Sequence, residues 1–149
     1  HNYSSSTIIN SRQKNVVTAI SNLQQWEKES SWQLFYEEAI YLHQQQQWQL
    51  AEKKYQELLL WQPHNSLVLF QLGVLYYQIE NYQESISAVS KSLEIEPNSY
   101  GYYYHGLGLE KINQIEQAIA SYQQAIQLDE KNSAAILIAS CFIISKYSS

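Results

Sequence analysis

The stretch LFQLGVLYYQIENYQESISAV (residues 69–89) decides the fold of this chain. Leu69, Leu72 and Tyr76 recur at intervals of three and four residues, which is the spacing of one helical face and not the alternation of a strand. Asn81 then interrupts the pattern, and asparagine tolerates the backbone that a tight turn requires. From Ser85 the helical spacing resumes. The stretch therefore predicts two short helices joined by a turn.

The same unit occurs three times along the chain. The copies cover residues 32–65, 66–98 and 99–132, and Pro63 and Pro97 stand at matching places near the ends of the first two. Ala51, Ser85 and Ala118 begin matching segments in the second half of each copy. One pair of helices cannot bury its apolar face alone, so stacked pairs are expected to share one continuous core.

Short motifs within the copies resemble the tetratricopeptide repeat (TPR) family. Leu69, Leu72, Gly73 and Tyr76 reproduce its W-x2-L-G-x2-Y pattern with leucine in the place of tryptophan, and Tyr102 takes that place in the third copy. The small-x3-aromatic pattern of the second helix appears as Ala51/Tyr55 and Ala118/Tyr122, with a weaker Ser85/Val89. The resemblance covers residues 32 to about 146. It implies an all-α fold, an α-solenoid of antiparallel helix pairs with about seven or eight helices.

The register of the copies places the helices. We expect helices at residues 32–45, 48–61, 66–79, 82–95, 99–112 and 115–128, with Asn81 and Asn113 in two of the turns. Small residues, among them Gly73 and Gly106, should let the two helices of a pair approach closely. As domains we expect an N-terminal polar tail and amphipathic helix (1–31), three repeats (32–65, 66–98, 99–132) and a C-terminal capping or interface helix (133–149).

Both ends of the chain carry apolar residues beyond the three copies. In residues 11–30, Val16, Ile20 and Leu23 lie at helical spacing, which predicts one amphipathic helix after a loosely structured stretch at 1–10. Residues 133–146 are apolar almost all round, so the helix there should be buried on two faces. Either it contacts another chain or further structure continues from it.

The charge and the single cysteine narrow the classes of partner. The formal net charge is −5, and residues 80–130 hold eight acidic residues against Lys91 and Lys111. A phosphate backbone is bound by lysine and arginine, so we expect no nucleic acid partner. The one cysteine and the absence of a signal-peptide pattern in these residues favour a cytoplasmic location. The longest apolar run near the end covers only residues 134–144, too short for a membrane span.

Catalytic and metal-binding patterns find no support. GLGLEK (106–111) lacks the third glycine of a dinucleotide loop and the Lys-Ser/Thr of a P-loop. His43, His64 and His105 are isolated, so no zinc pattern emerges; we expect His105 to pack between helices and His64 to be exposed. Cys141 lies in an apolar helix and is expected to be a buried, unreactive thiol. We expect no enzyme activity, no cofactor and no metal.

In the TPR family the first helix of each pair lines a concave surface. The corresponding stripe in this sequence is aromatic and apolar, and its candidate partner-binding residues are Tyr36, Ile40, His43, Leu67, Phe70, Val74, Tyr77, Tyr100, Tyr103 and Leu107. In the last helix the possible interface residues are Leu137, Cys141 and Ile144. The family's carboxylate clamp, made of lysine, arginine and asparagine, is absent, so an acidic EEVD-like tail is not the expected ligand.

These patterns favour an adaptor or scaffold that binds a protein or peptide. The expected ligand is an apolar or amphipathic peptide or helix, held by aromatic contacts in the groove. Two alternatives stay open. One is homo-oligomerisation through the apolar terminal helices, and the other is that the repeats form a regulatory module of a larger enzyme.

Overall fold

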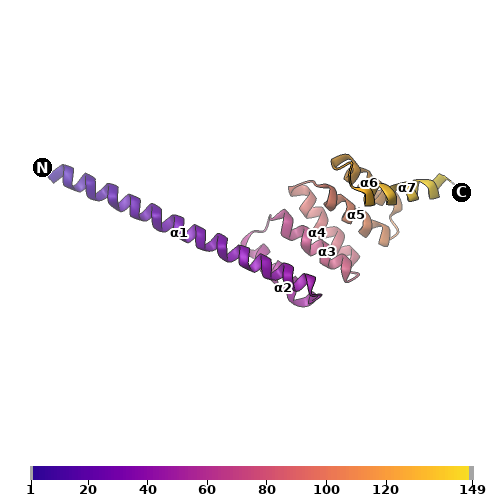
Figure 1. The fold of residues 1–149 in the computed structure, drawn as a ribbon, viewed down its shortest axis with the longest axis horizontal. Helices are drawn as coiled ribbons and strands as arrows, with labels where there is room; N and C mark the ends of the chain where they lie inside the picture. The colour runs from indigo at the N-terminus through magenta and orange to yellow at the C-terminus, as the bar shows by residue number, and fades with distance from the viewer. Residues whose placement is uncertain (1, 148–149) are drawn as a thin grey trace. The chain divides into compact units, whose positions relative to one another are not determined.

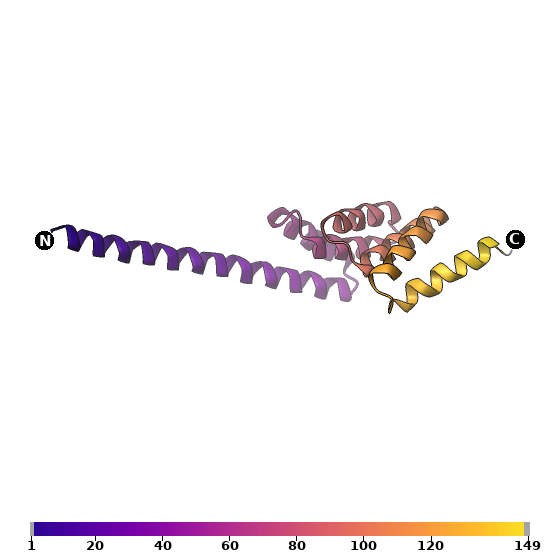
Figure 2. The ribbon, with the colours of Figure 1, turned by 90° about the horizontal axis from the view of Figure 1, so that it is seen from above.

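The computed structural model describes the backbone of residues 2–147 and the side chains of residues 10–146. Over the described backbone the chain forms seven α-helices and no strand (Figures 1 and 2). The helices are α1 (Asn2–Gln44), α2 (Trp48–Trp61), α3 (Ser66–Gln78), α4 (Tyr82–Ile95), α5 (Ser99–Lys111), α6 (Ile115–Leu128) and α7 (Ser133–Tyr147). The all-α solenoid predicted from the sequence is confirmed, and α2 to α6 begin and end within one residue of the expected positions.

The chain divides into two compact units. The first runs to Glu38 and the second starts at Ala39, so the boundary falls inside α1. The second unit holds the end of α1 and all of α2 to α7, and in both views these helices follow one another as a stacked series that ends with α7 (Figures 1 and 2). Each unit is described by itself below.

Helix α1 differs from the sequence-based expectation. We expected a loose stretch at residues 1–10, a helix over 11–30 and another over 32–45, but one helix runs from Asn2 to Gln44. Of the stretch expected to be loose, His1 lies outside the described residues. Ser30 and Ser31 are weak helix formers, yet neither proline nor glycine interrupts the segment. Around them, Gln25 donates to Glu29 at 2.8 Å and Gln33 donates to Glu37 at 3.2 Å, each across one helical turn.

The turns inside the three pairs share one geometry. Gln46, Glu80 and Asn113 have φ angles of 59°, 66° and 63° and occupy the equivalent position in each copy. After each of them the next backbone N–H donates to a carbonyl five residues back, that of Leu42, Tyr76 or Leu109. This is the Schellman ending of a helix, in which one residue takes the left-handed conformation. The expectation for Asn113 is confirmed; Asn81 instead has φ −91°, because the left-handed residue of that turn is Glu80.

Glycine allows the two helices of a pair to meet. A Cβ atom built at Gly73 of α3 would overlap the Cγ2 atom of Val89 in α4, and one at Gly106 of α5 would lie 2.5 Å from the Tyr122 ring in α6. The predicted close approach at both glycines is confirmed. The core also continues from one helix pair to the next helix. Leu109, Ala118, Tyr122 and Ala139 form a buried cluster shared by α5, α6 and α7.

Candidate partner-binding surface

The first helices of successive pairs start in the same register. Asparagine precedes α3, α5 and α7, and the side-chain oxygens of Asn65, Asn98 and Asn132 accept from backbone N–H groups three residues later. Each satisfies a donor that a helix start leaves free. The three asparagines therefore give a common reference, and residues of α3, α5 and α7 at the same distance from them are equivalent.

Aromatic rings connect these helices along the predicted stripe and beside it. The Tyr104 ring lies at the centre, with centroid distances of 5.6 Å to Phe70, 5.9 Å to Tyr77 and 5.5 Å to Tyr103, all edge-to-face. Such contacts are favourable beyond the area that they bury. The series continues from Tyr77 to Tyr82 at 5.6 Å and from Tyr103 through Tyr122 to Phe142. A series of aromatic contacts therefore links α3, α4, α5, α6 and α7.

Several predicted contact residues are part of the packing between helices. Val74 and His43 are each only 8 % exposed. Tyr103 and Leu107 pack partly buried against the core cluster of α5, α6 and α7. Phe70 and Tyr77 are half-buried in the ring series, and burial raises the pKa of the Tyr77 hydroxyl. These residues support the surface rather than project from it.

His43 illustrates why such a residue cannot serve as a free contact. Its Nδ1 atom lies 2.8 Å from the Tyr55 hydroxyl, and its Nε2 atom is hydrogen-bonded to the Gln78 side chain. The imidazole therefore joins the end of α1 to α2 and α3. We leave His43 and Val74 out of the proposed contact surface for this reason.

Other predicted residues are open to solvent. Leu67 is 49 % exposed and Tyr100 is 65 % exposed, and they occupy the same position in α3 and α5. Ile40 is half-buried in the second unit, whereas Tyr36 belongs to the first unit, where its ring stacks on Trp32 with centroids 5.4 Å apart.

Helix α7 packs on α6 along one side only. Ala135 and Ala139 are buried, but Leu137 and Ile144 are each 66 % exposed. Cys141 is an exposed free thiol, so the expectation that it is buried is wrong. The sequence pattern indicated correctly that α7 is apolar all round; it could not indicate which sides are covered.

Two tyrosine hydroxyls bind carboxylates between helices. Tyr122 of α6 donates to Glu110 of α5 at 2.8 Å, and Tyr76 of α3 donates to Glu52 of α2 at 2.9 Å. Burial and the neighbouring carboxylate raise the pKa of Tyr76 to about 12 and that of Tyr122 further. Both hydroxyls therefore remain protonated donors at neutral pH.

We expect His105 to make the stability of the repeats dependent on pH. Its Nδ1 atom lies 2.8 Å from Ser121 Oγ across α5 and α6, as expected for a helix-packing residue, and burial lowers its pKa. The unfolded chain therefore binds a proton near pH 6.5 that the folded chain does not. As the pH is lowered past about 6.5, the free energy of unfolding should decrease, by up to about 1.4 kcal/mol per pH unit.

Urea unfolding between pH 7.5 and 5.5 measures this dependence. His105→Gln should show a flatter pH profile than the wild-type chain, because it removes the group that takes up the proton. His64→Gln, in an exposed loop, is the matched control and should keep the wild-type profile. An unchanged slope in His105→Gln would contradict the assignment.

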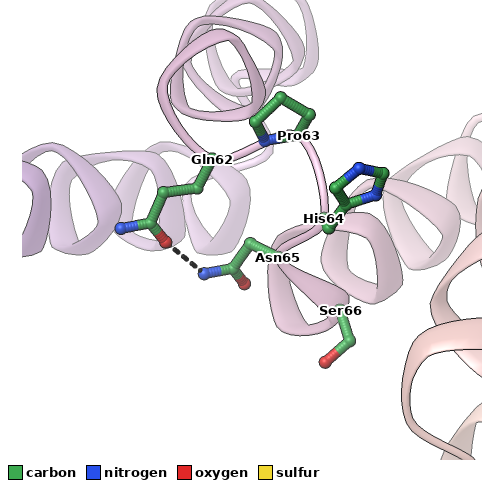
Figure 3. Close-up of a pocket in the computed structure, with 5 residues that line it drawn as sticks. All are labelled: Gln62, Pro63, His64, Asn65 and Ser66. Carbon is green, nitrogen blue, oxygen red and sulfur yellow. Dashed lines mark hydrogen bonds between the residues drawn. The ribbon is translucent and has the colours of Figure 1, made fainter.

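A surface hollow of about 470 Å³ lies at the loop between α2 and α3. Gln62, Pro63, His64, Asn65 and Ser66 line it, and Asn65 donates to Gln62 at 2.8 Å (Figure 3). The imidazole of His64 points away from this pair and is exposed, as expected. The described residues contain no group of three His, Cys, Asp or Glu side chains that could hold a metal ion. Among the residues that line the hollow, His64 is the single titratable side chain.

The stacked pairs and their shared first-helix surface define an α-solenoid repeat protein. Residues 66–99 and 100–132 each match the tetratricopeptide repeat family, and these segments coincide with α3–α4 and α5–α6. Residues 66–132 therefore consist of two tetratricopeptide repeats. Curated protein sequences gave no significant match. Among helices of the described residues, none has both the length and the apolar character needed to cross a membrane.

Solved structures share the fold. The first TPR of Spaghetti (RPAP3), bound to the HSP90 peptide SRMEEVD, is 14% identical with a TM-score of 0.73, over 76% of this chain and 91% of that one. The translocator chaperone SycD of Yersinia enterocolitica has a TM-score of 0.76 at 13% identity, over 79% and 96% of the chains. SycD in complex with a peptide of the translocator YopD has a TM-score of 0.73 at 15% identity, over 76% and 93%. At such identities the likeness shows the fold alone.

Tyr104 and Tyr82 were not expected from the sequence to belong to the ring series. Tyr104 follows directly after Tyr103, and consecutive helix residues point in different directions, so only one of them was assigned to the stripe. The Tyr104 side chain instead points toward α3, where its ring makes edge-to-face contacts with Phe70 and Tyr77. The aromatic residues at positions 70, 77 and 104 were the feature of the sequence from which this ring series could have been predicted.

Proposed function

We propose that this protein is a non-catalytic adaptor that binds an apolar or amphipathic peptide or helix along its first helices. Leu67 and Tyr100 carry the proposal. They repeat at one position of α3 and α5, are largely exposed, and follow the same stripe as the packed rings of Phe70 and Tyr103. Exposed apolar and aromatic side chains on a rigid support are typical anchors for a partner.

The charge of the repeats favours an apolar ligand over an acidic one. No lysine or arginine stands among the stripe residues of α3 and α5, and residues 80–130 carry eight acids against two lysines. An acidic peptide tail would therefore meet repulsion rather than a clamp. We expect the peptide SRMEEVD, which the similar RPAP3 repeat binds, not to bind here.

The structural comparisons support peptide binding in general terms. Two of the similar structures, from RPAP3 and SycD, hold a peptide. The proposal for this chain adds the chemical class of the ligand, which follows from its own side chains. Tyrosine hydroxyls on the stripe could also donate to backbone carbonyls of a bound peptide.

The test uses peptides selected against the protein. A displayed library of helical peptides with apolar residues at positions i, i+3, i+4 and i+7 is selected against the wild-type chain, and the affinity of selected peptides is measured by calorimetry. Leu67→Ala and Tyr100→Ala should each weaken binding about tenfold, because each removes an exposed anchor of about 1–2 kcal/mol. Circular dichroism should show unchanged helicity.

Matched controls are available at similar exposure. Leu128 in α6 is 51 % exposed and Tyr41 in α1 is 59 % exposed, and neither lies on the stripe. Leu128→Ala and Tyr41→Ala should leave the affinity unchanged. If the controls weaken binding as much as the stripe variants, or if SRMEEVD binds as tightly as the apolar peptides, the proposal is wrong.

A further inference from the structure

Helix α7 has the sequence pattern of a first helix, but among the described residues no second helix follows it to complete a pair. Register with α3 and α5 aligns Ile136, Ser140 and Ile143 with Leu69, Gly73 and Tyr76, and with Tyr102, Gly106 and Leu109. In α3 and α5 a second helix covers these positions: Val89 meets Gly73, and Tyr122 meets Gly106. In α7, Ile136 and Ile143 are each 38 % exposed, whereas Leu69, Tyr76 and Leu109 are all at most 9 % exposed.

Helix α1 contains the complementary pattern. AISNLQQW (19–26) aligns with AIASYQQA (118–125) of α6, with four of eight residues identical. Ala19 and Leu23 take the places of Ala118 and Tyr122, the small and large residues with which α6 packs on α5. Yet Leu23 is 61 % exposed and Trp26 is 64 % exposed, whereas Tyr55, Val89 and Tyr122 at the position of Leu23 are completely buried.

We propose that residues 16–26 of α1 in one copy of the chain pack on the Ile136–Ile143 face of α7 in a second copy. Leu23 then lies over Ser140 as Tyr122 lies over Gly106, and Val16 and Trp26 extend the contact along α7. Each copy supplies the half of a repeat pair that the other exposes. Burial of these apolar side chains drives the association.

Charge does not oppose this pairing. Residues 10–26 contain Arg12 and Lys14 and no acid, and the one charged residue of α7, Lys146, is paired with Glu116 at 3.4 Å. Because the two faces are unlike, the contact either closes as a reciprocal pair of chains or continues into a longer assembly.

The test disrupts the α1 face in one variant and the α7 face in another, and then mixes the two variants. Leu23→Asp and Ile143→Asp each place an unpaired charge in the contact, which should weaken association about 100-fold. Sedimentation equilibrium of the full chain over a concentration series should show that wild type associates and that each variant alone is monomeric. A mixture of the two variants should form a complex of two chains, because Leu23→Asp retains an intact α7 and Ile143→Asp retains an intact α1.

Controls on the opposite side of each helix complete the design. Ser21→Asp and Ser145→Asp lie two residues from Leu23 and Ile143, a rotation of roughly 200°, and should associate like wild type. A monomeric wild-type chain at every concentration would overturn the proposal. So would continued association of Ile143→Asp alone, which would indicate pairing between two α1 helices, or of Leu23→Asp alone, which would indicate pairing between two α7 helices.

Discussion

Replacing Tyr122 with alanine is expected to lower the free energy of unfolding by about 3–5 kcal/mol. The Tyr122 side chain is completely buried at the junction of α5, α6 and α7, where its ring covers Gly106 and stacks near Phe142. Removal of the ring leaves a cavity that the neighbouring helices could fill only by shifting toward one another. Urea unfolding followed by circular dichroism measures the loss.

Tyr122→Phe is the matched variant. It keeps the ring and removes only the hydroxyl that donates to Glu110 at 2.8 Å. The expected loss is about 1–2 kcal/mol, the contribution of one hydrogen bond to a charged partner. Equal losses in the two variants would show that the hydrogen bond, and not the packing of the ring, determines the stability of this junction.

Gly73→Ala is expected to destabilise the chain by about 1–3 kcal/mol, although alanine is the better helix former by about 1 kcal/mol. The new methyl group would overlap Val89 Cγ2 and lie 3.3 Å from both the Ser85 carbonyl oxygen and the Val89 nitrogen. Val89 is completely buried and stiff at χ1, so it cannot turn away. Helices α3 and α4 must separate, which strains the hydrogen bond from Ser85 Oγ to the Gly73 carbonyl. Thermal and urea unfolding both report the change.

A second substitution isolates the cause. Val89→Ala removes the methyl groups that the new side chain meets, so Gly73→Ala with Val89→Ala should be more stable than the sum of the two single losses predicts. Additive losses would mean that the clash with Val89 is not the source of the effect.

The repeats were predictable because sequence and local structure agree in them. Each motif residue of α3 and α4 acts locally, since Gly73 permits the close approach of the two helices and the leucines fill the core between them. The continuity of α1 was not predictable. The serines at residues 30 and 31 lower helix propensity only slightly, and the start of the first repeat copy contains no residue that ends a helix. The boundary at residue 31 was placed from the repeat register and not from a helix-breaking residue.

The candidate surface was predictable as a stripe but not residue by residue. Helical spacing assigned Phe70, Val74, Tyr103 and Leu107 to the first-helix face, but the exposure of each depends on side chains from neighbouring helices. Val74 is buried, while Leu67 and Tyr100 at the start of their helices extend beyond the packing. The position of a residue in its helix predicts the direction of its side chain. Whether that side chain is buried depends on contacts with helices that are distant in sequence.

Gly108 lies on the contact between successive pairs, where a Cβ atom would be 2.8 Å from Ile86 Cγ1. The small rotation from one pair to the next sets the curvature of a solenoid, and the distance between α4 and α5 sets that rotation. A bulky side chain at Gly108 would wedge the pairs apart and change the pitch of the superhelix. The distance between Leu67 and Tyr100 would change with it, so Gly108, which lies outside the proposed contact surface, would help to set the length of peptide that this surface can accommodate.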